Sequence, residues 1–273
     1  MALGSGAAEA FAIVQRFPAA PSSPFLTDRH YLLYARAGTM TLEADGKRWT
    51  LPPARAAIIP ANQPIRVALP RPVEACSVLF NAKVFAAPAP ALTVVDMTPL
   101  ARELIHACST WTDATRPLDS YGRLLFEALA AVVGRLAQRP SLISMPVARS
   151  REVAAAVRLV EDRLAAPPDF EAVALEVGSS PRSLARKMAD ELGLTWRQTV
   201  QRLRMIEAIT RLSEAGDVRV TAVAFAVGYE SLSAFNVAFR ELTGTTPTQY
   251  RRALQAANTG FGTDAPTARA TDK

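Results

Sequence analysis

The feature that most constrains the fold of this chain is an internal repeat near the C-terminus. The segment FEAVALEVGSSPRSLARKMADELGLT (170–195) is paralleled by VTAVAFAVGYESLSAFNVAFRELTGTT (220–246). Each copy has an Ala- and Val-rich stretch that ends in Val-Gly, then a short turn, then a second stretch with large apolar residues four positions apart. Two copies of one pattern predict two copies of one small structural unit.

The unit that fits this pattern is a helix-turn-helix. Gly178 and Gly228 follow the first predicted helix of each copy, where the backbone is expected to be left-handed and glycine has no steric cost. Ser180 before Pro181 supplies an N-cap and a preset first residue for the second helix, and Ser231 serves similarly in the other copy. A single such pattern fits any pair of antiparallel helices, whereas two copies favour a DNA-binding domain.

A long amphipathic segment, TWRQTVQRLRMIEAITRLSEA (195–215), joins the two copies. Its apolar residues recur at helical spacing, so it predicts a connecting helix that packs against both units. A rigid connector would hold the two second helices at a fixed separation. Since successive major-groove faces of B-DNA lie about 34 Å apart, one chain could occupy two adjacent grooves.

The two faces of each second helix differ in composition. Rotation by about 100° per residue brings the large apolar residues to one side, which we expect to be the core of each recognition helix. These core residues are Leu184, Met188, Phe235 and Phe239. A merely solvated opposite face would carry long Glu and Lys side chains, whereas Ser, Asn, Ala and Val beside Arg suit close approach to base edges.

The N-terminal half has the pattern of short strands. Met40, Leu42 and Ala44 alternate with polar residues, and Asp45-Gly46 predicts a tight hairpin turn. Prolines then divide the apolar runs into short pieces, so the segment from about residue 11 to 85 predicts a small β-sandwich or barrel.

Two helical segments follow the predicted strands. PLARELIHACSTW (99–111) and DSYGRLLFEALAAVVGRLAQ (119–138) have helical periodicity, and the second has one long apolar face. This face fits a dimer interface and fits packing against the chain's own barrel equally well. Its apolar residues are Leu125, Leu129, Val132, Val133 and Leu136.

Composition narrows the function classes. Two cysteines, Cys76 and Cys108, and two histidines, His30 and His106, are the only ones in 273 residues, so a His-rich metal site is excluded by count. No apolar run is long enough to span a bilayer, and we expect no secretory signal, because the N-terminus lacks a basic start and a long apolar segment. The formal net charge of +6 is not concentrated in the C-terminal half. Charge alone therefore does not indicate DNA binding; the repeat does.

The C-terminal repeat resembles the AraC/XylS-type DNA-binding domain over residues 150–254. The matching positions are the run Val223–Gly228 and Leu184, Arg186, Gly193, Arg204, Ser231, Ser233, Phe235, Phe239, Gly244, Thr246, Pro247, Tyr250 and Arg251. VGYESLSAFNVAFRELTGTTPTQYRR is the most specific portion. The resemblance implies seven helices, two helix-turn-helix units (170–193 and 220–244), and a role in transcriptional regulation.

The same resemblance implies which residues contact DNA. Base-contacting positions of the family match Arg182, Ala185 and Arg186 in the first reading helix and Ser233, Asn236 and Val237 in the second. Lys187 and Arg240 are expected at phosphates. Because Ala185 and Val237 carry no hydrogen-bonding group, they are left with thymine-methyl contacts, and direct reading is expected to depend mainly on the two arginines and Asn236.

The N-terminal half is similar, more loosely, to the cupin-like sensor barrel of such regulators. The resemblance implies a small-molecule effector, with no metal, because Asn62-Gln63 stands where a cupin histidine is common. The ligand-binding residues stay unknown. Conceivable lining residues are Tyr31, Tyr34, Arg36, Trp49 and Arg66, and each fits strand packing or solvent exposure at least as well.

The predicted fold is α+β with two domains. A cupin-like sensor barrel at 1–96 is followed by a helical region at 97–138 for dimerisation or barrel packing, and then by a Pro- and Ser-containing linker at 139–150. An all-α, AraC-type DNA-binding domain at 151–254 precedes a disordered tail at 255–273.

The predicted function is sequence-specific transcriptional regulation under the control of a small-molecule effector. The expected partners are double-stranded DNA, the effector, a second copy of the chain and, for an activator, RNA polymerase. We predict no catalytic residues, no cofactor, no metal and no membrane partner, and a cytoplasmic, nucleoid-associated location. The alternative is a cupin-type enzyme or ligand-binding protein with an accessory DNA-binding domain, which the missing histidines disfavour.

Overall fold

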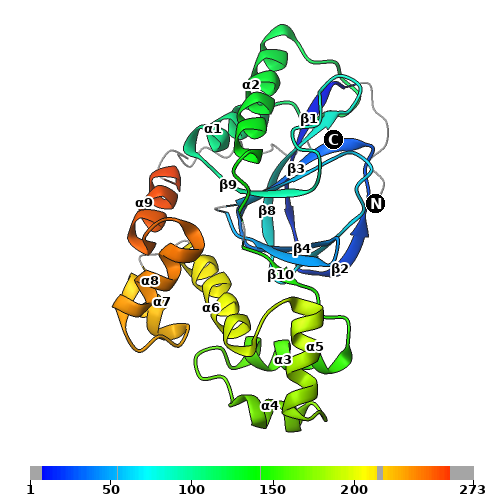
Figure 1. The fold of residues 1–273 in the computed structure, drawn as a ribbon. Helices are drawn as coiled ribbons and strands as arrows, with labels where there is room; N and C mark the ends of the chain where they lie inside the picture. Colours follow the sequence, from blue (N-terminus) through cyan, green and yellow to red (C-terminus); the bar gives the residue numbers. More distant parts are fainter. Residues whose placement is uncertain (1–7, 54, 142, 214–217, 259–273) are drawn as a thin grey trace, which may run out of the picture.

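The structure is a computed structural model that describes residues 8–53, 55–141, 143–213 and 218–258, the last six of these by their backbone alone. An N-terminal domain built from strands and two helices is followed by a C-terminal domain built from helices (Figure 1). The predicted two-domain α+β fold is therefore confirmed.

The strands form two separate five-stranded antiparallel sheets. Sheet A has the order β1-β8-β3-β6-β9, and sheet B has the order β10-β5-β4-β7-β2. The strands are β1 (Ala10–Phe17), β2 (Ala20–Phe25), β3 (Arg29–Ala37), β4 (Met40–Ala44), β5 (Lys47–Leu51), β6 (Arg55–Ile59), β7 (Ile65–Leu69), β8 (Val73–Asn81), β9 (Thr93–Asp96) and β10 (Met145–Pro146). The expected Asp45-Gly46 turn joins β4 to β5, with both residues at positive φ.

Sheet A is covered on both faces, so its central strands are buried throughout. Alternate residues of a strand point to opposite faces. Leu33 of β3 packs into the core between the two sheets, whereas its neighbour Leu32 packs against helices α1 (Pro99–Cys108) and α2 (Ser120–Ala137). This double cover explains why seven consecutive residues at the start of β3 are buried.

The apolar face of α2 packs against the chain's own sheet. Phe126, Leu129 and Val133 are fully buried in the same cluster as residues of sheet A. Of the two roles that the sequence left open for this face, the structure shows packing on the barrel. Tyr121 and Leu124 are each 64% exposed, so a second apolar surface remains on this helix.

The predicted linker at 139–150 is partly built into the N-terminal domain. Its Met145 and Pro146 form β10, which pairs with Arg48 and Lys47 of β5. Ser141 N donates to Val94 O at 2.7 Å, so the segment also contacts the edge of sheet A. This strand could not be predicted from the sequence, because two residues are too few to show a period.

The C-terminal domain consists of seven helices among the residues described, the number that the resemblance implies. They are α3 (Arg151–Asp162), α4 (Phe170–Glu176), α5 (Pro181–Leu192), α6 (Trp196–Ser213), α7 (Val220–Ala226), α8 (Leu232–Thr243) and α9 (Pro247–Asn258). α9 continues to Asn258, four residues past the predicted end of the domain at 254. The rest of the predicted tail, 259–273, lies outside the described residues.

Helix α6 joins two small hydrophobic cores. One contains α3, α4 and α5, and the other contains α7 and α8. Ile206 of α6 packs against both, which confirms the expected connecting helix. None of the helices that the structure describes has the length and apolar character needed to cross a bilayer.

The two domains contact each other where α6 lies against β5 and where α9 lies against α1. Arg48 of β5 forms an ion pair with Glu161 of α3. Burial raises the pKa of the Glu161 carboxyl, and Arg48 opposes that shift. This ion pair therefore joins the helical domain to sheet B.

Candidate nucleic-acid interface

The two helix-turn-helix units have the same backbone design. Gly178 and Gly228 follow the first helix of each unit at φ values of 70° and 85°. In each turn the next residue donates its N–H back into the first helix, from Ser179 N to Ala174 O at 2.8 Å and from Tyr229 N to Ala224 O at 2.9 Å. Both predicted glycine turns are therefore present. Glycine occupies these positions because a left-handed backbone is strained for residues with a Cβ atom.

The second helices, α5 and α8, begin and end alike. Ser180 Oγ accepts from Ser183 N at 3.2 Å, and Ser231 Oγ accepts from Ala234 N at 3.5 Å, so each helix has a serine N-cap. Each helix then ends at a left-handed glycine, Gly193 or Gly244. These caps fix the start and the length of both candidate reading helices.

The helix after each reading helix also begins alike. Thr195 and Gln198 form a reciprocal capping box at the start of α6, with Gln198 Oε1 accepting from Thr195 N at 2.8 Å. Thr246 and Gln249 make the same pair of bonds at the start of α9. The internal repeat therefore extends beyond the two glycines into the following helix.

The inner faces of α5 and α8 hold these helices in place. Leu184, Met188, Phe235 and Phe239 are 0 to 1% exposed. The ring of Phe239 lies 5.5 Å from that of Tyr250 on α9, in an edge-to-face contact. Each reading helix is thus fixed by a buried apolar stripe, which leaves the other side free for contacts.

The outer faces carry the residues expected to contact bases. Arg182, Ala185 and Arg186 of α5 are exposed, as are Ser233 and Val237 of α8, while Asn236 is partly exposed. Val237 presents 57% of its surface to solvent. Each unit therefore presents short, polar or basic side chains away from its core.

The two expected phosphate contacts lie in different surroundings. Arg240 of α8 is exposed. Lys187 of α5 is two-thirds buried and donates through Nζ to Glu152 Oε1 of α3 at 2.8 Å. The hydrogen bond from Lys187 lowers the pKa of Glu152. Lys187 is therefore used to hold α5 on α3, a role that the sequence reasoning did not foresee.

A cleft of about 720 Å³ lies beside the second reading helix. It runs between α8 and the segment that precedes α4, and its lining includes Val237, Trp196 and Arg197. Arg197 is exposed in the first turn of α6. This arginine was not predicted from the sequence because it belongs to the connector; its place inside the Thr195–Gln198 capping box was the available signal.

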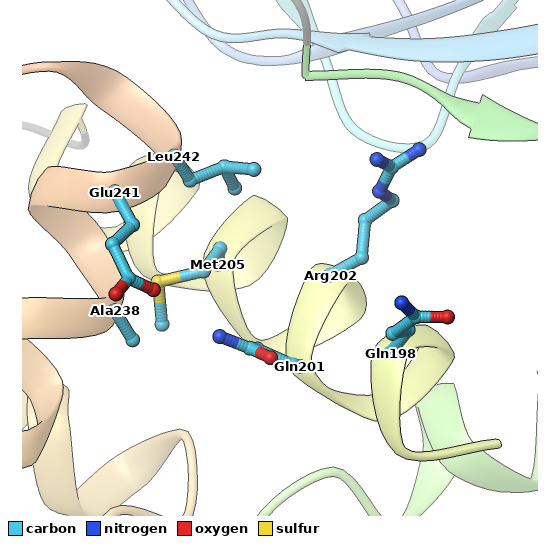
Figure 2. Close-up of a pocket in the computed structure, with 7 residues that line it drawn as sticks. All are labelled: Gln198, Gln201, Arg202, Met205, Ala238, Glu241 and Leu242. Carbon is cyan, nitrogen blue, oxygen red and sulfur yellow. The ribbon is translucent and has the colours of Figure 1, made fainter. Parts of the chain in front are cut away.

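A smaller pocket of about 160 Å³ separates α6 from α8. Figure 2 shows Gln201 and Met205 of α6 facing Glu241 and Leu242 of α8 across it. Arg202 extends away from α8 and donates to Ser144 O at 3.2 Å. One face of the connector therefore lies along the second reading helix, and another is tied to the segment before β10.

The N-terminal domain contains a separate apolar cavity of about 550 Å³. Its lining comes from both sheets and from the segment before α2: Phe11, Ala12, Ile13, Val14, Gln15, Phe17, Phe25, Tyr31, Leu33, Met40, Val67, Leu69, Val73, Ala75, Thr112 and Ala114. This size lies within the range of small-molecule sites.

Only Tyr31 of the five conceivable lining residues is part of this cavity. Tyr34 and Trp49 are buried in packing clusters. The other two are at the surface, where Arg36 pairs with Glu74 at 3.0 Å and Arg66 donates to Ser22.

Among the residues that the structure describes, no group of three or more His, Cys, Asp or Glu could hold a metal ion. His30 is buried, and its Nδ1 accepts a hydrogen bond from Ala61 N at 3.0 Å. Burial lowers the pKa of His30. This histidine therefore packs as a neutral structural residue.

Comparisons with known proteins agree with this architecture. A family model described as a helix-turn-helix domain matches residues 173–253. The chain is 29% identical over 223 residues to the HTH-type transcriptional regulator NimR of Escherichia coli, covering 80% of this chain and 78% of that protein. It is 32% identical over 97 residues to the HTH-type transcriptional activator RhaS of Escherichia fergusonii, covering 36% and 34% of the two chains.

A solved structure of ToxT from Vibrio cholerae, titled as bound to an unsaturated fatty acid, is 12% identical, with 90% of this chain and 96% of that chain covered and a TM-score of 0.38. The domain match runs from within α4 to within α9 and so includes both α5 and α8. Residues 173–253 therefore form a helix-turn-helix domain of the AraC type, and the chain is similar to DNA-binding transcriptional regulators.

Proposed function

We propose that one chain reads two successive major grooves of a specific DNA site, α5 in one groove and α8 in the next. The observation that carries this proposal is the pair of equally built units on one connecting helix, each with a buried apolar stripe and an exposed polar face. A recognition helix docks in the major groove through such a face.

The proposed base contacts follow from side-chain chemistry. Arg182 and Arg186 suit bidentate contacts with guanine, and Asn236 suits adenine. Ser233 can bond to more than one base, while Ala185 and Val237 offer contacts to thymine methyl groups. Arg240 is proposed at a phosphate, since its long basic side chain lies at the end of the α8 face.

A binding selection tests this function. Genomic fragments retained by the purified chain should share a two-part sequence, and Arg186→Ala and Asn236→Ala should each cost about 1–3 kcal/mol on that sequence. Arg16→Ala, which removes an exposed arginine from β1, is the matched control and should bind like the wild type. No shared sequence, together with unchanged binding by both variants, would reject the proposal.

The N-terminal domain is proposed to sense an apolar small molecule in its cavity. The support is the apolar lining, with Gln15, Thr112 and the Tyr31 hydroxyl available to orient a ligand. A library of apolar compounds should contain members that raise the melting temperature of the wild type and change its DNA affinity. Ala75→Leu, which fills part of the cavity, should abolish both effects while keeping DNA binding without ligand.

We also propose that the regulator is a homodimer, acts in the cytoplasm on chromosomal DNA and has no enzymatic activity. The exposed Tyr121 and Leu124 on α2 support a surface for self-association. Contact with RNA polymerase is proposed if the regulator is an activator.

A further inference from the structure

A single arginine on the connecting helix touches both the segment that precedes the first helix-turn-helix unit and the turn of the second. Arg204 of α6 donates through Nε to Leu164 O at 3.2 Å and through Nη2 to Ala165 O at 3.3 Å. Both carbonyls belong to the segment that leads from α3 into α4, directly before the first unit. The same guanidinium lies 5.7 Å from the ring centroid of Tyr229, in the turn of the second unit.

Glycine is required at the neighbouring position for the two units to meet. A Cβ on Gly228 would lie 2.3 Å from Ala165 O and 2.6 Å from Arg204 Nη2. A Cβ on the equivalent Gly178 would meet nothing within 4 Å. The two turns share one backbone conformation, yet of the two only the second is in close contact with the segment between α3 and α4.

The contact reaches the second reading helix directly. The ring of Tyr229 lies 5.4 Å from that of Phe235, which is fully buried in α8. On the other side, Leu164 packs against the core of the first unit. Arg204 is thus the centre of a junction, formed with Leu164, Ala165, Gly228 and Tyr229, that links the first core to α8.

The chemistry of the junction suits a rigid link. The guanidinium is planar, and its donors form a fixed fork, so two carbonyl contacts set its orientation. The ring of Tyr229 adds a cation–π contact on the guanidinium. A shift of either unit would break these contacts together, because all of them share one side chain.

We propose that Arg204 is a positioning residue that fixes α5 relative to α8, so that the domain accepts one spacing between its two DNA segments. The inference rests on the proposed two-groove function. One inserted base pair moves the second segment by about 3.4 Å and turns it by roughly 35°. A rigid junction cannot move α8 to meet the shifted segment. A loosened junction can, but it binds DNA of the original spacing less tightly.

The DNA test uses duplexes selected by the wild-type chain and derivatives with one base pair inserted or deleted between the two contacted segments. We expect the wild type to lose about tenfold or more in affinity per change, as linked sites do when geometry forbids their joint use. Arg204→Met keeps the aliphatic stem and removes the donors, and the penalty should fall to about threefold or less, in proportion to the lost rigidity.

Two matched pairs separate this role from a loss of folding. Gly228→Ala and Gly178→Ala bring the same strain at positive φ, but only the first should relax the spacing requirement. Tyr229→Phe keeps the ring and should behave like the wild type, whereas Tyr229→Leu should resemble Arg204→Met. Full retention of the spacing penalty in Arg204→Met and Gly228→Ala would overturn the inference.

A measurement without DNA distinguishes failure of the inference from failure of the proposed function. Spin labels at Ala189→Cys on α5 and Arg240→Cys on α8 report the distance between the reading helices. The distance distribution should be narrow with Arg204 present and should broaden in Arg204→Met. An unchanged distribution would contradict the junction. The wild type could also show a narrow distance distribution and yet select no two-part DNA site. That result would reject the two-groove function but not the junction.

Discussion

Lys187 on the first reading helix donates to Glu152 on α3 at 2.8 Å, and both side chains are one-third exposed. The pair lies next to the face expected to meet DNA, since Arg186 precedes Lys187 and is exposed. A lysine held by a carboxylate adds little to phosphate binding. The second unit has no lysine among its expected contacts, and its basic residue Arg240 is exposed instead.

This relationship predicts an unequal effect of the two expected phosphate contacts. Glu152→Gln should release Lys187, raise DNA affinity and steepen the dependence of log K on log salt by up to about one unit. Titrations over a range of salt concentrations would measure both changes. Glu103→Gln, which removes an exposed carboxylate from α1, is the charge-matched control and should have no effect on the slope. If Glu152→Gln and Glu103→Gln changed the salt slope equally, the effect would come from net charge and not from the release of Lys187.

Arg186 and Arg240 should differ in what their loss does to sequence preference. Arg186→Ala should cost about 1–3 kcal/mol on the selected site and relax the preference at one base pair. Arg240→Ala should weaken binding to all sequences alike and reduce the salt slope by about one unit. Binding to a set of single-base variants of the site would separate the two patterns. Uniform weakening by Arg186→Ala would place that arginine at the backbone.

Two leucines on α2 should respond in opposite ways to truncation. Leu129 is fully buried against sheet A, so Leu129→Ala should cost about 2–5 kcal/mol in unfolding free energy. Leu124 is 64% exposed, so Leu124→Ala should change stability by less than about 0.5 kcal/mol.

Denaturant unfolding measures the free energy of unfolding of Leu129→Ala and Leu124→Ala. Sedimentation of Leu124→Ala tests the proposed dimer. A dimer that stays intact in Leu124→Ala and in Tyr121→Ser would place the self-association surface elsewhere.

The two cysteines should be unreactive in the folded chain. Cys76 and Cys108 are both buried and free. Burial raises the pKa of Cys108 to about 12, with the neighbouring Cys76 adding to the shift, so almost no thiolate is present at pH 8. A thiol reagent should label both residues in denaturant and neither, over the same time, in buffer. Rapid labelling of the native chain would show that the packing of α1 on sheet A opens easily.

Local patterns in the sequence predicted the parts of the fold that depend on neighbouring residues. The glycine turns, the serine caps and the Asp45-Gly46 hairpin each follow from backbone preferences within a few positions. The period of the helices placed Phe235 and Phe239 on the side that is buried. These features need no knowledge of distant contacts.

Features that depend on distant residues could not be predicted in the same way. The face of α2 that contains Leu129 is apolar whether it meets a sheet or a second chain, and only the fold decides between them. The ion pair of Lys187 joins residues 35 positions apart, and the bonds of Arg204 reach 39 and 40 positions back. The apolar cavity combines residues of both sheets, with no signature in any one strand.

The short strand β10 also has a consequence for how the protein can be divided. It covers the outer edge of β5, which would otherwise leave the backbone groups of sheet B open to pairing with another molecule. A fragment that ends before Met145 should therefore aggregate through this edge, while one that extends through Val147, whose N–H bonds to Gly46 O at 2.8 Å, should stay dispersed. The segment between the domains therefore also protects sheet B from pairing with the strands of another molecule.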